Sequence, residues 1–577
     1  MCEGYAPPRA KAQSHRPERL LLPKPKLASI LESSSKTLAT STPPQSIHLR
    51  PLATPMPRFG FEMNEEDKWY FTLFRFQIAH ELSPYYPSKF WTQTSLRDSL
   101  TNQCVHHSIL SIGAYGRALM DFRNEPTGKV FRTWRPPAVP NRHHQAALVH
   151  HAKALSHLRS NIRSYGIDGR LTMAATLLFI VFENMQGNYH SSGNLIRSGI
   201  KVLTNMRNRG SDSSSGSRSI LRRQWHRYQT AQQDEVDEMT SIFLRHSVQC
   251  AYIPFAHGKF AYHILLTEDE DEDEGEEDDA AVPLDSPFTF SPPQTVEQAK
   301  HIWDHLEVRM ANFLSKAQWY KASPRYAFDE ADAYGEQAMY LSILSELGVW
   351  LASLAYHAAD TRNHRDTRGL ELLRLWHSVA VVAVSCCLDP TEMAYDKFLP
   401  DFDDILHRYR LFEELPPPAD APARMGFTNE VAKIPILAFV AAKCRVARVR
   451  REVVELMGDF DRREGVWDGF NALSAVVDIM RLEGQLDHHT HPHHSQHQNQ
   501  NQQSSSSSSS VSVASSSLSP SHAAEEEDAA VAVPAEARYT WANTFWDFEK
   551  RHMNVEYIKV LPNALGEFER VRCVLGS

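Results

Sequence analysis

Cysteine is scarce in this chain, with seven among 577 residues. No two of them stand in a C-x2-C pair, and the only neighbours are Cys386 and Cys387. This spacing argues against a disulfide framework and against a complete zinc site, so we expect free thiols buried in helices. The cysteines are Cys2, Cys104, Cys250, Cys386, Cys387, Cys444 and Cys573.

Long apolar runs are also missing. No run reaches the 18 residues that a membrane span requires, and one of the longest lies near 177–182. The N-terminus lacks the pattern of a signal peptide, because the apolar stretch 20–22 is short and is followed by Pro23. We therefore expect a soluble, intracellular protein with no membrane partner.

Sequence signatures of catalysis are absent as well. The chain has no G-x-x-x-x-G-K-[ST] phosphate loop, no G-x-G-x-x-G and no G-x-S-x-G nucleophile elbow. Residues 113–116 (GAYG) lie inside a helical pattern rather than after a strand. Asp401, Asp403 and Asp404 cluster without the spacing of a calcium-binding loop. We predict no catalytic and no cofactor-binding residue, and a protein that is not an enzyme.

The net charge of −9 comes from one segment, residues 268–279, which holds eleven acidic residues in twelve positions. Without that segment the formal charge is +2, so the body offers no broad basic surface to nucleic acid. We expect this acidic run to form a solvated loop, and the alternatives are an interaction tail, a calcium-binding tract or a decoy for a basic partner.

Composition divides the chain into four parts. A Pro-, Ser- and Lys/Arg-rich arm cannot bury enough apolar surface to order itself. A long helical body follows, and it is interrupted by polar insertions. A low-complexity linker then precedes an aromatic C-terminal segment. The expected bounds are 1–58 for the flexible basic arm, 59–486 for the all-helical domain, 209–219 and 267–298 for its disordered insertions, 487–536 for the linker and 537–577 for the last segment.

Apolar periodicity in the body is helical and strand signals are scarce, so we predict an all-α fold of antiparallel helix pairs. Asn64 is a suitable N-cap, followed by three acids, for a helix that ends before Pro84. The nearly continuous apolar segment 171–185 predicts a buried helix. Gly187 and Asn188 then form the turn into a second helix, which makes an antiparallel hairpin.

Two groups of histidines invite a metal-binding hypothesis. His143, His150 and His157 stand seven residues apart, about 10 Å along a helix, which is too far for one ion. We predict a solvated basic helix face there. The histidine-rich tract 488–497 has no apolar anchor, so we predict a linker, with opportunistic metal binding as the alternative.

The C-terminal segment is rich in aromatic residues. Trp541, Phe545 and Phe548 are spaced by four and three residues, which predicts a helix that docks on the main domain. Acidic neighbours Asp547 and Glu549 leave an activation segment as the alternative.

Residues 1–5 (MCEGY), followed by two prolines and a basic run, resemble the exit from the binuclear zinc cluster of fungal six-cysteine transcription factors. Only Cys2 matches a zinc ligand of that family, the last one. Three stretches of the body resemble the family's middle homology region. They are ALVHHAKAL–LR in 147–159, LLFIVFENMQGNY–LIRSGIKVL in 177–203, and IPILAFVAAKCR–RRE–EGVWD in 434–468.

This resemblance implies a nuclear, all-helical regulatory domain whose partners are the transcription machinery or related regulators. In full-length family members, zinc folds the module that reads DNA. Five ligands and the neighbouring lysines are missing here, so Cys2 alone is not expected to bind zinc. Specific DNA binding is expected only if a zinc cluster upstream of Met1 is restored, that is, if the start of the chain was assigned too late. One alternative is a helical scaffold, or a dimerisation partner of full-length regulators, that lacks the zinc-cluster module. The other is an unrecognised helical enzyme.

Overall fold

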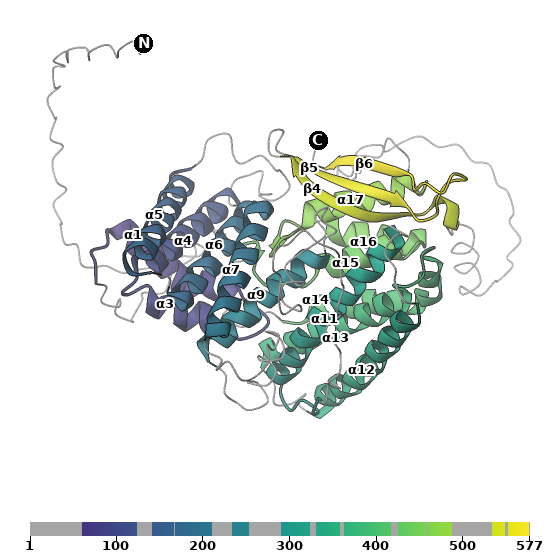
Figure 1. Cartoon of the computed structure of the whole chain (residues 1–577), viewed down its shortest axis with the longest axis horizontal. Coiled ribbons are helices and arrows are strands. Elements are labelled where there is room, and N and C mark those ends of the chain that lie inside the picture. The colour runs from purple at the N-terminus through teal and green to yellow at the C-terminus, as the bar shows by residue number, and fades with distance from the viewer. Residues whose placement is uncertain are drawn as a thin grey trace, which may run out of the picture. The chain divides into compact units, whose positions relative to one another are not determined.

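The computed structural model (Figure 1) describes residues 60–123, 141–166, 168–209, 234–252, 290–322, 330–357, 363–416, 425–458, 460–486, 533–547 and 552–575. The chain divides after Met56, and all of these residues belong to the unit Pro57–Ser577. The predicted arm, the acidic run and the histidine tract lie outside the described residues, as does the low-complexity linker up to residue 532.

The first group of helices starts where the sequence predicts. The Asn64 side chain accepts a hydrogen bond from the Asp67 amide at 2.7 Å and caps the first helix. The helical path then continues through a short π-helical turn to Glu81. The group comprises α1 (Glu65–Leu73), α2 (Ala79–Glu81), α3 (Ser95–Asp98), α4 (Gln103–Arg123), α5 (Arg142–Tyr165), α6 (Gly169–Gln186), α7 (Tyr189–Arg209) and α9 (Glu235–Tyr252).

The predicted hairpin of α6 and α7 is confirmed. Gly187 has a φ of 78°, and its amide bonds to the Asn184 carbonyl, which closes α6 with a left-handed cap. The Asn188 side chain donates to the Glu183 carboxylate at 2.6 Å. The side chains from Met173 to Phe182 are buried on all sides of α6, as their continuous apolar sequence indicates.

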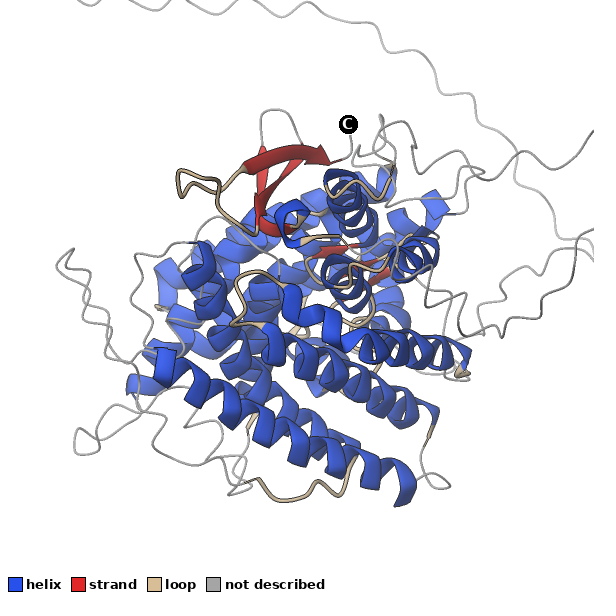
Figure 2. Ribbon diagram, turned by 90° about the vertical axis from the view of Figure 1, so that its right-hand side faces the viewer, coloured by secondary structure: helices blue, strands red, loops and turns tan. Residues whose placement is uncertain are grey.

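A second group of helices follows the first. Its helices join the first group in one continuous hydrophobic core, which extends from Tyr70 to Leu575. Figure 2 shows that helices make up most of the described body, which confirms the all-α prediction for it. The group comprises α11 (Val296–Ala322), α12 (Glu330–His357), α13 (His364–Cys386), α14 (Leu399–Glu414), α15 (Ile434–Lys443), α16 (Ala447–Gly458) and α17 (Gly469–Leu482).

Helix α12 is less buried than its neighbour α13. One side packs against α13, while Val349 and Tyr356 on the other side are 66% and 82% exposed. By length and composition, α12 and α13 could each cross a membrane. In α13 the apolar residues belong to the hydrophobic core, because 67% of its most apolar 18-residue window is buried. The corresponding share in α12 is 28%.

Three two-residue strands form a small sheet beside the helices. Strand β1 (Phe427–Thr428) pairs in parallel with β2 (Arg463–Glu464), which pairs antiparallel with β3 (Trp467–Asp468). The carboxylate of Glu464 accepts hydrogen bonds from three successive amides, 432–434, at the start of α15. A negative charge at a helix N-terminus is favourable, so the sheet anchors α15.

The prediction of a C-terminal helix is wrong. The segment forms an antiparallel sheet of β4 (Tyr539–Asp547), β5 (His552–Lys559) and β6 (Arg570–Leu575), which lies against α17 in Figure 1. Exposure in β6 alternates residue by residue, the two-residue period of a strand. The helix-like spacing misled the prediction, because Trp541 and Phe545 pair with residues of β5, and Phe548 lies outside the described residues.

Candidate ligand site between the helical groups

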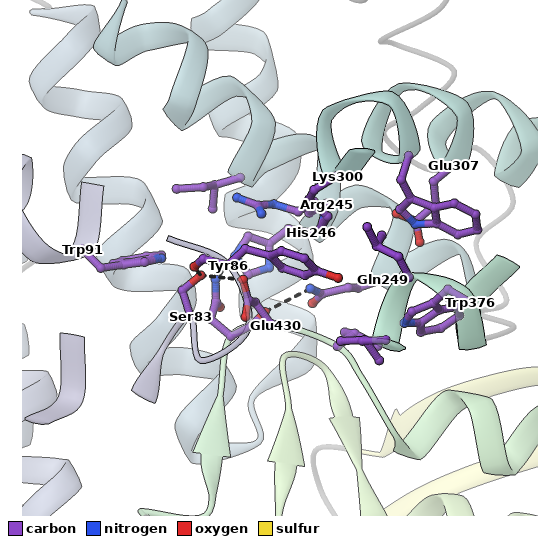
Figure 3. Close-up of a pocket in the computed structure, with 16 residues that line it drawn as sticks. Ser83, Tyr86, Trp91, Arg245, His246, Gln249, Lys300, Glu307, Trp376 and Glu430 are labelled. Atoms are coloured by element: carbon purple, nitrogen blue, oxygen red, sulfur yellow. Dashed lines mark hydrogen bonds between the residues drawn. The ribbon is translucent and has the colours of Figure 1, made fainter. Parts of the chain in front are cut away.

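A cavity of about 50 Å³ lies where the first and second groups of helices meet. Its walls come from α9, α11 and α13, from the segment 83–91 and from the loop 429–431 (Figure 3). These elements are far apart in the sequence and come together only in the folded chain. The space would hold roughly three to five water molecules.

Glu430 holds two of these walls together. Its carboxylate accepts hydrogen bonds from Ser83 Oγ at 2.5 Å and from the Tyr85 amide at 2.9 Å. The backbone amide of Asn429 donates a hydrogen bond to the Leu82 carbonyl at 3.0 Å. Burial raises the pKa of Glu430 above its ordinary value, although the charge of Arg245 and these hydrogen bonds oppose the shift. Glu430 therefore joins the loop 429–431 to the segment 83–85, and this floor of the cavity carries the titratable carboxyl group of Glu430.

His246 of α9 lies in the wall of this cavity as a neutral imidazole. Its Nε2 is 3.1 Å from the Asn429 side-chain amide nitrogen, which can only donate, so Nδ1 carries the proton. Burial and the charge of Arg245 lower the pKa of His246 to about 3, against the smaller opposing effect of a side-chain hydrogen bond with Gln249. Among the described residues of the cavity wall, Asn429 Oδ1 is buried without a hydrogen-bond partner, and His246 Nδ1 and Gln249 Oε1 form no hydrogen bond of good geometry. Each is a polar atom that a bound molecule could satisfy.

The two cations of the cavity differ in their partners. Lys300 forms an ion pair with Asp304 one helical turn away, and its ammonium lies 5.0 Å from the centre of the Tyr86 ring. Arg245 is half-buried and makes no hydrogen bond or ion pair within the described part of the chain. Burial raises the pKa of Asp304, but the charges of Lys300 and Arg245 outweigh it and lower that pKa overall. Arg245 therefore influences nearby carboxylates without being neutralised by direct contact.

The remaining lining is aromatic and aliphatic. Trp91, Trp303 and Trp376 contribute large apolar surfaces from three different elements. The Tyr86 hydroxyl donates to the Gly369 carbonyl at 2.9 Å, so it is already satisfied. The cavity thus combines an apolar wall with a few polar atoms, the usual composition of a small-molecule site.

The structure corrects the prediction of a solvated histidine face on α5. His143 and His150 are 7% and 6% exposed, because this face packs against α4 and contacts two side chains of α1. His143 Nδ1 is 2.7 Å from the Tyr70 hydroxyl, and His150 Nε2 is 3.2 Å from the Asp67 carboxylate. Of the three histidines, His157 alone is partly exposed, and it stacks on a histidine of α4.

The other sequence-predicted candidates occupy ordinary structural positions. Cys2 lies outside the described residues, and in the described ranges no three His, Cys, Asp or Glu side chains are grouped to hold a metal ion. Asp403 and Asp404 form ion pairs with Arg448 and Arg408. Gly113 lies in α4, where an added Cβ would meet the Tyr70 carbonyl oxygen at 2.4 Å, so its role is close packing. The free cysteines at 104, 386, 387 and 444 are buried.

Sequence reasoning found none of the cavity residues. The available signal was weak: His246 and Gln249 interrupt an apolar face of α9 at a spacing of three residues. Buried polar residues on such a face indicate either a satisfied core contact or a site. Contacts with residues some 180 positions away, such as Asn429, decide between them.

Comparison with known proteins gives one positive result. Residues 70–268 match the family of the fungal specific transcription factor domain. This range covers most of the first group of helices and two of the three stretches whose resemblance the sequence suggested, 147–159 and 177–203. The third stretch, 434–468, lies outside it. No curated protein and no solved structure matches the chain.

Proposed function

We propose that this protein is a transcription regulator that acts through binding and that works in the nucleus. The observation that carries the proposal is the match of residues 70–268 to the fungal specific transcription factor domain. That family is not an enzyme family. The transcription machinery or related regulators are the proposed partners, and the helical body is the proposed regulatory part.

The described residues do not fit the zinc cluster of six-cysteine regulators. Such a cluster needs six thiolates held together, whereas Cys104, Cys444 and the pair at 386–387 are buried in different helical surroundings. Burial raises the pKa of Cys444 to about 11, which disfavours the thiolate that binds zinc. We therefore assign specific DNA reading to a module other than this helical body.

A tethering experiment tests the proposal. The full chain is fused to an unrelated DNA-binding module and expressed in a fungal reporter strain. We expect reporter expression to differ from that with the DNA-binding module alone, because the helical body would recruit or block transcription components. Equal expression from the two proteins, at equal abundance on an immunoblot, contradicts the proposal.

Two glycine variants supply a matched control. Gly113→Ala forces a Cβ against the Tyr70 backbone in the matched region and should abolish the effect on the reporter. Gly335→Ala in α12 places its Cβ in open space and should leave the effect unchanged. Retention of the effect in both variants would show that it does not depend on the folded domain.

A further inference from the structure

We propose that the cavity between α9, α11 and α13 binds a small carboxylate that also carries a hydrogen-bond donor, an α-hydroxy or α-amino acid. The inference rests on the proposed function only in treating this molecule as an effector of the regulator. Binding of the acid depends on the cavity residues alone.

Arg245 supplies the site for the carboxylate. Its guanidinium is half-buried at the cavity and has no hydrogen-bonded anion within the described residues. The two acids whose pKa values Arg245 lowers, Asp304 and Glu430, are already held by Lys300 and by Ser83 with the Tyr85 amide. A third acid, Glu307 of α11, also lines the cavity. A guanidinium binds a carboxylate through two parallel hydrogen bonds, which is stronger than a neutral contact.

His246 and Asn429 supply complementary polar atoms. His246 Nδ1 carries a proton that it can donate to a ligand oxygen, and Asn429 Oδ1 can accept from a hydroxyl or ammonium group. Both side chains are more than nine-tenths buried, so each unsatisfied atom costs free energy while the cavity lacks a partner for it. A simple carboxylic acid without a donor group would accept from His246 Nδ1 but would leave Asn429 Oδ1 unpaired.

The volume limits the ligand to a small molecule. A space of about 50 Å³ corresponds to roughly three to five waters, which suits an acid of about three carbons. The indoles of Trp91 and Trp376 lie on opposite sides of the lining (Figure 3), and each offers an apolar surface at its own side of the cavity. Because the walls come from both helical groups, a bound acid would stabilise their contact and link α9, inside the matched range, to α11 and α13 beyond it.

Thermal unfolding of the full chain with defined probes tests this inference. The probes are sodium lactate and alanine, with propionate lacking the donor, lactamide lacking the charge, and sodium chloride matching the ionic strength. We expect a saturable rise in the unfolding temperature with lactate or alanine, a weaker rise with propionate and none with lactamide. The comparison of lactate with alanine tells which donor the site prefers.

Variants locate the effect at Arg245. Arg245→Gln should weaken binding by about tenfold or more, because a charge-assisted bidentate contact is lost. Arg245→Lys should retain part of the binding affinity, because the positive charge remains. The matched control is Arg408→Gln, whose guanidinium pairs with Asp404 on α14 away from the cavity.

Two outcomes overturn the inference. One is the absence of a saturable shift with both lactate and alanine, and the other is an equal shift in Arg245→Gln and the unaltered protein. The measurement contains no DNA and no transcription. A negative result in the unfolding experiment therefore does not contradict the proposed function. Likewise, an unchanged reporter does not contradict binding of the acid.

Discussion

Arg450 donates a hydrogen bond to the carboxylate of Glu483 at 2.6 Å, and both side chains are completely buried. Arg450 also donates to the Ala441 carbonyl at 2.8 Å, while Glu483 accepts from the Tyr539 amide at 2.8 Å. This one ion pair therefore connects α15, α16, the end of α17 and the first strand of the C-terminal sheet. Buried ion pairs become costly when only one partner is present.

Glu483→Leu should lower the free energy of unfolding by about 3–5 kcal/mol, because it leaves buried arginine charges uncompensated. The double variant Arg450→Met with Glu483→Leu should be less destabilised than the sum of its single changes. Urea unfolding followed by circular dichroism measures both. Strictly additive effects would show that the two residues are not coupled.

Arg538→Met should loosen the C-terminal sheet. The buried Arg538 guanidinium donates to the Val533 carbonyl at 2.9 Å, the Glu392 carbonyl at 2.8 Å and the Asp396 carboxylate at 2.6 Å. Losing these contacts should cost about 2–4 kcal/mol locally and speed amide hydrogen exchange in β4 to β6.

The control for this change is Arg570→Met in β6. Arg570 is half-exposed, and its buried partner Glu556 keeps a second ion pair with Arg572, so exchange should barely change. Similar exchange in the two variants would mean that Arg538 does not anchor the sheet.

Gly187→Ala should destabilise the α6–α7 hairpin. An alanine with a φ near 78° costs about 1–2 kcal/mol. Its Cβ would also lie 3.0 Å from the Arg463 guanidinium, which is held by Asp468 and the Met185 carbonyl. Gly484→Ala has a similar φ of 75° but open space, so it should cost less. Equal changes in the unfolding temperature would argue against the Arg463 contact.

Stability should fall as the pH falls below neutrality. Burial lowers the pKa of His106, His246 and His305 to about 3 each. Between pH 6.5 and that value the unfolded chain binds a proton at each histidine and the folded chain does not. Each site therefore removes roughly 1.4 kcal/mol of stability per pH unit in this window.

The histidine variant His106→Leu isolates one of these contributions. Urea unfolding at about pH 7 and about pH 5, on either side of the ordinary histidine pKa, should show a smaller loss of stability in the variant than in the unaltered protein. Parallel pH profiles would show that His106 is protonated equally in the folded and unfolded chains.

Local sequence patterns predicted the parts of the fold that depend on neighbours in the chain. The Asn64 cap, the apolar α6 and the Gly187 turn all arise from residues within about one helical turn of each other. The failures lie where a partner is distant. The β4 strand needs β5, and burial of His143 and His150 needs α1 and α4, which periodicity along α5 cannot reveal.

The sequence by itself determined that the body is helical, because caps, glycine turns and the 3.6-residue apolar period act over short distances. It also argued against a zinc cluster made within the chain, because cysteine spacing is a local property. Only the tertiary structure decided where the cavity lies. Its floor joins Tyr85 to Glu430 across 345 positions, and such a contact forms only when hydrophobic burial brings distant elements together.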